Sequence, residues 1–198
     1  MNENIIIREY KPEDESKWLD IHAGVMVDSY AWWTVIHKKI VYEKEVIDLV
    51  ACSEGKITGF LVAEINSDVC KEKDTAFVWD FGVQRKHRNK KTGTNLIAQL
   101  HKIMNEKFNI NKSIWYTQDP DSQKFYEHIG MKEIGRHWQL SIEPVKDQLI
   151  SFRENKFVTW SIRGSCEMDD LEKVKSVYKV SEDDSLKPMI CVGYEFVL

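Results

Sequence analysis

Patterns that bind metals or form disulfides are missing from this sequence. Its 198 residues include only four cysteines, which are Cys52, Cys70, Cys166 and Cys191, and no two of them form a CxxC pair. The histidines are scattered and do not stand at the spacing of a ligand set. We therefore expect reduced thiols, no bound metal and a cytosolic protein, because stable disulfides belong to oxidising compartments.

Long apolar segments are missing as well. No apolar run approaches the ~20 residues that cross a bilayer, and the acidic N-terminus lacks the basic start and apolar core of a signal peptide. A net charge of -4 gives no general reason to expect nucleic acid as a partner. We expect a cytoplasmic protein without a membrane or nucleic-acid partner.

Familiar nucleotide motifs are missing too, since neither GxxxxGK nor GxGxxG occurs. What the sequence has instead is a concentration of positive charge in an acidic chain. Six basic residues occupy seven positions: Arg85, Lys86, His87, Arg88, Lys90 and Lys91. Such a cluster indicates a site for an anion, although a solvated basic loop is the alternative.

The hydrophobic pattern predicts a mixed α/β domain. Alternating apolar residues predict strands over residues 5–8, 46–52, 57–65, 76–83, 113–117 and 138–142. Helical spacing or capping residues predict helices that begin near Pro12, over residues 94–108, and from Asp119 to Gly130. Within the predicted strand 76–83, alternation places four side chains on one face: Phe77, Trp79, Phe81 and Val83.

The character of the chain changes after Pro144. Residues 157–162 alternate, residues 168–178 show helical spacing and residues 189–197 form another predicted strand. We therefore divide the chain into a domain over residues 1–143 and a small βαβ extension over residues 144–198. The extension is small for an independent fold, so we expect it to pack on the first domain or in a dimer.

The basic cluster lies where the predicted strand 76–83 runs into a turn and a helix. A helix N-terminus presents free backbone N–H groups and the positive end of the helix dipole, which suits a phosphate or pyrophosphate. Gly93 lies at the start of the helix, where a missing Cβ lets a ligand approach the backbone. The residues and their order therefore predict a phosphate site, with a simple turn as the alternative role of Gly93.

At this loop the sequence resembles the GNAT superfamily of acyl-CoA-dependent N-acyltransferases. Members carry Arg or Gln, two free positions, Gly, one free position, then Gly or Ala, and here these places hold Arg88, Lys91 and Gly93. Lys91 departs from the glycine of the pattern. A second segment resembles the family's Asn-x-x-Ser/Ala and Phe-Tyr-Glu-x-x-Gly-Phe pattern in Ser122, Phe125, Tyr126, Gly130 and Met131, with Asp119 in place of Asn. The resemblance covers residues 5–142.

The resemblance implies a central mixed β-sheet flanked by helices, with acetyl-CoA as co-substrate. In such a fold the strands 76–83 and 113–117 part, and the pantetheine arm lies between them beside the backbone of Phe81 and Val83. The pyrophosphate would lie on Arg88, Asn89, Lys90, Lys91, Thr92, Gly93 and Thr94. The other side of the coenzyme would meet Asp119, Ser122 and Phe125.

The resemblance also implies that Tyr126 protonates the departing thiolate, although a packed tyrosine with a structural role is the alternative. Asp80 and Glu64 are the candidate carboxylates for removing the proton of the amine. No cysteine or serine stands where a covalent nucleophile is expected, so the transfer is expected to proceed by direct attack of the amine.

The acceptor side is less defined by the sequence. The aromatic residues Tyr30, Trp32 and Trp33 fall where the family covers its substrate, and they can line a pocket for an apolar or cationic group or belong to the core. The expected partner is a primary amine of a small molecule or peptide, and a homodimer is possible. The alternative function is a non-catalytic acyl-CoA-binding module with an interacting tail.

Overall fold

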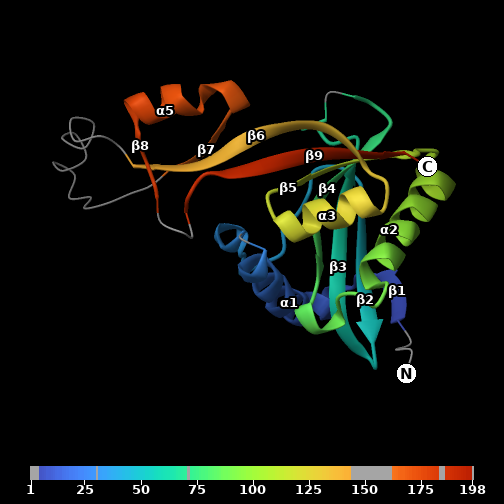
Figure 1. Cartoon of the computed structure of the whole chain (residues 1–198). Coiled ribbons are helices and arrows are strands. Elements are labelled where there is room, and N and C mark those ends of the chain that lie inside the picture. Colours follow the sequence, from blue (N-terminus) through green and yellow to red (C-terminus); the bar gives the residue numbers. More distant parts are fainter. Residues whose placement is uncertain (1–4, 30, 71, 144–161, 183–185, 198) are drawn as a thin grey trace.

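The computed structural model describes residues 5–29, 31–70, 72–143, 162–182 and 186–197. A single nine-stranded sheet runs through it (Figure 1). The strands are β1 (Ile5–Glu9), β2 (Val46–Ser53), β3 (Lys56–Ile65), β4 (Thr75–Val83), β5 (Lys112–Thr117), β6 (Lys132–Glu143), β7 (Ile162–Cys166), β8 (Lys179–Val180) and β9 (Met189–Val197). Their order is β1-β2-β3-β4-β5-β9-β6-β7, with β8 paired to β6. Only β4 and β5 are parallel, which confirms the mixed sheet.

Helices cover both faces of this sheet and bury two separate cores. The helical elements are η1 (Pro12–Asp14), α1 (Glu15–Asp28), η2 (Trp32–Thr34), η3 (Arg85–His87), α2 (Thr92–Ile103), η4 (Met104–Phe108), α3 (Pro120–His128), η5 (Met168–Asp170) and α5 (Leu171–Val177). The apolar stripe of α2 and Tyr126 of α3 pack on one face of the sheet. On the other face α1 buries Trp18, Ile21 and Val25 against β2 and β3. The burial of these apolar side chains is the main source of stability of both layers.

The predicted helices and strands of the first domain are all present, and most of their ends shift by no more than two residues, but β6 begins at Lys132 rather than at residue 138. The helix after the basic loop begins at Thr92 rather than residue 94, and it ends in the π-helical turn η4. Asp119 caps α3 and Pro120 is its first residue, as the sequence predicts. Residues 157–161 of the predicted tail strand lie outside the described residues, and β7 begins at Ile162.

A bulge in β4 changes the face on which its later residues lie. The register of β4 against β3 shifts by one residue between Val78 and Asp80, so that Trp79 is the extra residue. Beyond the bulge, Phe81 and Val83 pack into the core beneath α2, whereas the side chain of Trp79 is 41% exposed. Alternation does not continue through a bulge, so the expected common face is wrong for the set Phe77, Trp79, Phe81 and Val83.

The last strand lies inside the sheet rather than beside it. β9 pairs antiparallel with β5 on one side and with β6 on the other (Figure 1). Its residues Val192 and Tyr194 are buried in the main core. The end of the tail is therefore part of the first domain's sheet, while η5, α5 and β8 belong to the connection between β6 and β9.

The four cysteines are unpaired, as expected for reduced thiols. Within the described parts of the chain, no helix combines the length and the apolar character that crossing a membrane requires.

Candidate functional site

The parallel strands β4 and β5 separate beyond their first residues. Their pairing covers only residues 75–77 opposite 112–114. Past this point a cavity of about 900 Å³ opens between the two strands, and its walls include residues of the basic loop, of α3 and of the segment from α1 to η2. A long ligand can therefore lie where a neighbouring strand would otherwise pair, beside the backbone of Phe81 and Val83.

The basic loop forms one end of this cavity. Between β4 and α2 the backbone passes through η3 and reaches Lys91, which precedes α2 with a left-handed φ of 62°. This is the position where the resemblance places a glycine, and a non-glycine residue is strained there by about 1 kcal/mol. The hydroxyl of Thr92 donates to the carbonyl of His87 at 3.2 Å and closes the loop. The backbone N–H groups that a helix start leaves without intrahelical partners therefore lie, in α2, beside a turn that is already formed.

Gly93 has a packing role that the sequence did not indicate. A Cβ on this residue would come 3.2 Å from Cζ of Phe81 and 3.4 Å from Cζ of Phe125. Phe81 and Phe125 stack with their ring centroids 6.2 Å apart. The missing Cβ thus lets α2 approach the two rings that line the cavity.

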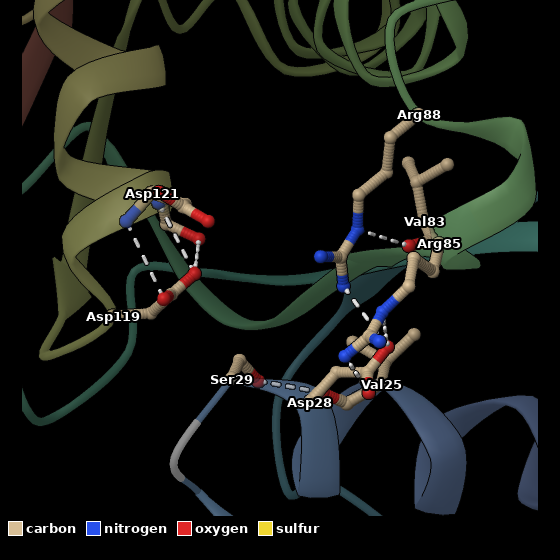
Figure 2. A network of polar contacts seen from close by, with 9 residues as sticks. Val25, Asp28, Ser29, Val83, Arg85, Arg88, Asp119 and Asp121 are labelled. Carbon is tan, nitrogen blue, oxygen red and sulfur yellow. Dashed lines mark hydrogen bonds and ion pairs between the residues drawn. The ribbon is translucent and has the colours of Figure 1, made fainter.

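Arg88 is held in place at the mouth of the cavity (Figure 2). Its Nε donates to the carbonyl of Val83 at 3.1 Å, and its Nη2 lies 3.7 Å from a carboxylate oxygen of Asp28. The same carboxylate accepts two hydrogen bonds from Arg85, whose side chain is 75% exposed. Two guanidinium groups therefore meet at the C-terminal end of α1, and the one belonging to Arg88 lines the cavity.

The wall opposite Arg88 is the beginning of α3 (Figure 2). The carboxylate of Asp119 accepts hydrogen bonds from the backbone N–H groups of Asp121 and Ser122 and from the hydroxyl of Ser122 at 2.7 Å. These bonds satisfy donors that a helix start leaves free, so the local sequence fixes this wall by itself.

Tyr126 approaches the cavity from the face covered by α2 and α3. Its side chain is almost fully buried among the rings of Trp115, Tyr194, Phe125 and Phe81. Burial, and then the negative charge of Asp119, raise the pKa of its phenol. The hydroxyl therefore keeps its proton at neutral pH and is available as a hydrogen-bond donor.

Asp80 approaches the same cavity from the opposite face of the sheet. Because a carboxylate only accepts, His22 donates its Nε2–H to Asp80 at 3.3 Å. His22 is buried and stacked on Trp18, with ring centroids 4.8 Å apart. Tyr42 is a further neighbour. Burial, and then the negative charge of Asp80, raise the pKa of its phenol. Asp80 is thus a cavity carboxylate held by His22 of α1.

The second candidate carboxylate has a different environment. Glu64 is buried, and its Oε2 accepts a hydrogen bond from Nε1 of Trp79 at 3.0 Å. It does not line the cavity, whereas Asp80 does. The geometry therefore favours Asp80 as the group that meets a ligand.

The structure brings together most residues that the sequence singled out. The cavity is lined by Phe81, Val83, Arg88, Asn89, Lys91, Thr92, Gly93, Thr94, Asp119, Ser122, Phe125, Tyr126 and Trp33. Lys90 is exposed on the same loop and is not part of this lining. Tyr30 lies outside the described residues, and of Trp32 only the backbone, in η2, is described.

Several lining residues escaped the sequence analysis. Trp79 and Tyr116 line the cavity with exposed rings, and Gln139 and Cys191 line it from β6 and β9. No local pattern marks them, because their approach depends on the bulge in β4 and on the insertion of β9 beside β5. His22 carries a faint signal, since it stands four residues after Trp18 on the buried side of α1.

Comparison with known proteins adds an independent line of evidence. The profile of the acetyltransferase (GNAT) family matches residues 5–131. No curated protein matches the chain. The PaiA N-acetyltransferase of Thermoplasma acidophilum, solved with coenzyme A, is 19% identical, with a TM-score of 0.54 over 66% of this chain and 91% of that one.

Two other solved structures extend the likeness over almost the whole chain. A putative streptothricin acetyltransferase of Bacillus anthracis, solved with acetyl coenzyme A, has 14% identity and a TM-score of 0.55 over 98% of this chain and 100% of that one. The ribosomal-protein-S18-alanine N-acetyltransferase of Escherichia coli has 11% identity and a TM-score of 0.56 over 98% and 93%. At these identities the likeness shows the fold. The profile match covers more than half of the chain and contains both the basic loop and α3, so this protein belongs to the acetyltransferase (GNAT) family and is an acyltransferase.

Proposed function

We propose that this protein transfers an acetyl group from acetyl-CoA to a primary amine of a small molecule or peptide. The observation that carries the proposal is the separation of β4 from β5, which opens a cavity with a basic loop at one end and carboxylate and phenol groups along it. Arg88 and the backbone at the start of α2 would hold the pyrophosphate. The exposed backbone of Phe81 and Val83 would pair with the pantetheine amides.

In the proposed reaction the amine attacks the thioester carbonyl carbon directly. Asp80 accepts the proton that the amine nitrogen loses, and the C–S bond breaks as the tetrahedral intermediate collapses. Tyr126 donates its proton to the sulfur as negative charge develops there, so that coenzyme A leaves as the neutral thiol. Because Asp80 and Tyr126 enter the cavity from opposite faces of the sheet, the base and the acid can act on the two sides of one carbonyl group.

The experiment that tests this function measures thiol release from acetyl-CoA across a panel of primary amines, with coenzyme binding followed separately by calorimetry. We expect amine-dependent thiol release and an N-acetylated product by mass spectrometry. Tight coenzyme binding without thiol release from any amine would favour the alternative, a non-catalytic acyl-CoA-binding module. The cytoplasmic location and the homodimer stay predictions; light scattering tests the second.

A further inference from the structure

The end of the cavity away from the basic loop is lined by aromatic rings and one carboxylate. Trp79 is 41% exposed and Tyr116 is 46% exposed, and both line the cavity together with Asp80. The ring of Tyr116 lies across Gly193 of β9, where a Cβ would come 2.6 Å from its Cε1. Large aromatic faces left open in a cavity are suited to contact a ligand.

The indole of Trp79 is fixed and made more electron-rich by its neighbours. Its Nε1 donates to the buried carboxylate of Glu64 at 3.0 Å. The ring of Phe77 packs edge-on against it with centroids 4.8 Å apart, and Tyr42 lies tilted at 5.9 Å. A carboxylate that accepts from the indole N–H adds to the negative charge on the ring faces. The exposed face of Trp79 is therefore a strong site for a cation.

The positive charges of the cavity lining lie away from its aromatic end. Arg88, Lys91 and Lys124 belong to the basic loop and α3, where the carboxylates of Asp119 and Asp121 also line the cavity. Among the described residues, the charged lining residue at the aromatic end is Asp80. Glu64 lies behind the indole of Trp79, from which it accepts a hydrogen bond, and Asp48 is paired with Lys39 at 2.6 Å. A positive group is stabilised at this end, whereas a carboxylate on a ligand would meet Asp80 with no cation to balance it among the described lining residues.

The guanidinium of Arg163 lies behind Trp33, at the edge of the aromatic end of the cavity. It lies 3.2 Å from the ring centroid of Trp33, and its Nη1 donates to the hydroxyl of Ser141 at 3.1 Å. Its Nε and Nη2 are sealed from solvent and have no partner among the described residues, so they offer no donor to the cavity. Trp33 therefore already has a cation on its ring, whereas Trp79 and Tyr116 line the cavity with exposed rings.

We propose that the acceptor is an amine with a second positive charge, such as a diamine, whose non-reacting ammonium lies over Trp79 and Tyr116. This inference rests on the proposed acetyl transfer and adds the class of its acceptor. The reacting amine would lie near Asp80, the neighbour of Trp79 in β4. An amino acid with a free carboxylate would be a poor acceptor at this site.

Three amines with the same five-carbon chain test this acceptor class: 1,5-diaminopentane, pentylamine and 5-aminopentanoate. We expect kcat/KM to fall in that order, with the diamine about 3- to 30-fold above pentylamine, the range of a cation on an aromatic face. Trp79→Leu should remove the advantage of the diamine over pentylamine, and Trp79→Phe should keep part of it. Tyr178→Leu, outside the cavity, should leave the order unchanged.

A binding measurement separates this inference from the proposed function. Tetramethylammonium has no N–H and cannot be acetylated; we expect it to quench the tryptophan fluorescence of the protein and not that of Trp79→Leu. Binding of this ion without turnover of any amine would overturn the acetyl transfer while keeping the cation site. If 5-aminopentanoate equals or exceeds the diamine, if Trp79→Leu slows the three amines equally, or if tetramethylammonium does not bind, the inference is wrong.

Discussion

Asp28, the last residue of α1, holds the guanidinium of Arg85 through two hydrogen bonds, at 2.7 and 3.2 Å (Figure 2). The same carboxylate lies 3.7 Å from Arg88, which lines the cavity while Arg85 does not. A helix from one face of the sheet is thereby tied to the loop that would bind the coenzyme. Arg85 and Arg88 thus share the carboxylate of Asp28, but of the two it is Arg88 that can contact a ligand in the cavity.

This difference predicts unequal effects of removing the two arginines. Arg88→Ala should raise the KM for acetyl-CoA about 10- to 100-fold, because a charge-assisted hydrogen bond to a phosphate contributes about 1.5–3 kcal/mol. Arg85→Ala is the matched control and should change the KM less than threefold. Steady-state kinetics and calorimetry with coenzyme A measure both. Equal effects of the two changes would contradict the assignment of Arg88 to the pyrophosphate.

Lys91 should be replaceable by the glycine of the family pattern with a gain in stability. Lys91→Gly removes the steric strain that a residue with a Cβ has at a left-handed φ of 62°. It should raise the free energy of unfolding by about 0.5–1 kcal/mol. Lys90→Gly removes the same charge at a residue without a positive φ, and it should stabilise nothing. Urea unfolding of both variants checks this. A loss of stability in Lys91→Gly equal to that of Lys90→Gly would show that the strain is not released.

Tyr126→Phe tests the proposed acid. The ring packs in the core, so the variant should fold and bind coenzyme A with little change. We expect kcat to fall about 10²- to 10⁴-fold, the usual contribution of a positioned acid. Unchanged turnover would assign the tyrosine a structural role only.

Asp80→Asn tests the proposed base. The variant should lower kcat/KM for the amine most strongly near neutral pH and recover activity towards high pH, where the free amine no longer needs a base. Asp48→Asn is the control, because Asp48 pairs with Lys39 and does not line the cavity. The pH–rate profile of the control should keep the shape of the unchanged protein. A profile of Asp80→Asn with that same shape would exclude Asp80 as the base.

The buried His101 predicts a loss of stability in mild acid. Trp115 donates to the hydroxyl of Ser113 at 2.8 Å, and the same hydroxyl is hydrogen-bonded to Nε2 of His101 at 3.0 Å. Burial lowers the pKa of His101 to about 4. In the unfolded chain this histidine has its usual pKa of about 6.5, so it binds a proton at a pH where the folded protein does not. The free energy of unfolding therefore falls between about pH 6.5 and 4, by up to about 3 kcal/mol.

Thermal unfolding at pH 7 and pH 5 measures this effect. His101→Gln keeps a polar partner for Ser113 and removes the titrating ring; it should be less stable at pH 7 and show a smaller fall to pH 5. The exposed His128 is the control, and His128→Gln should keep the full fall. An identical pH dependence in His101→Gln would assign the acid sensitivity to other groups.

The sequence predicted the elements well where the signal is local. The apolar stripe of α2, the Asp119-Pro120 cap of α3 and the basic residues after β4 each depend on neighbours within a few positions. The same holds for the site residues that rest on the two motifs, because a strand followed directly by a turn and a helix fixes where that turn lies. With the exception of Lys90, those residues line one cavity in the structure.

The acceptor side could not be predicted in this way. The bulge at Trp79 reverses the alternation of β4, and a bulge is decided by pairing with β3 rather than by the residues of one strand. The contact of His22 with Asp80 joins residues 58 positions apart. Neither leaves a periodic trace in the sequence.

By itself the sequence determined the order of the elements of the first domain, the basic turn at the start of α2 and the capped start of α3. These features follow from side-chain periodicity, charge and capping, which act over one or two turns of chain. Only the tertiary structure decided that β9 enters the sheet between β5 and β6, that β4 and β5 part after three residue pairs, and that Trp79 and Tyr116 face the cavity. Those outcomes depend on which distant segments pack together, and the free energy of that packing is shared among residues from the whole chain.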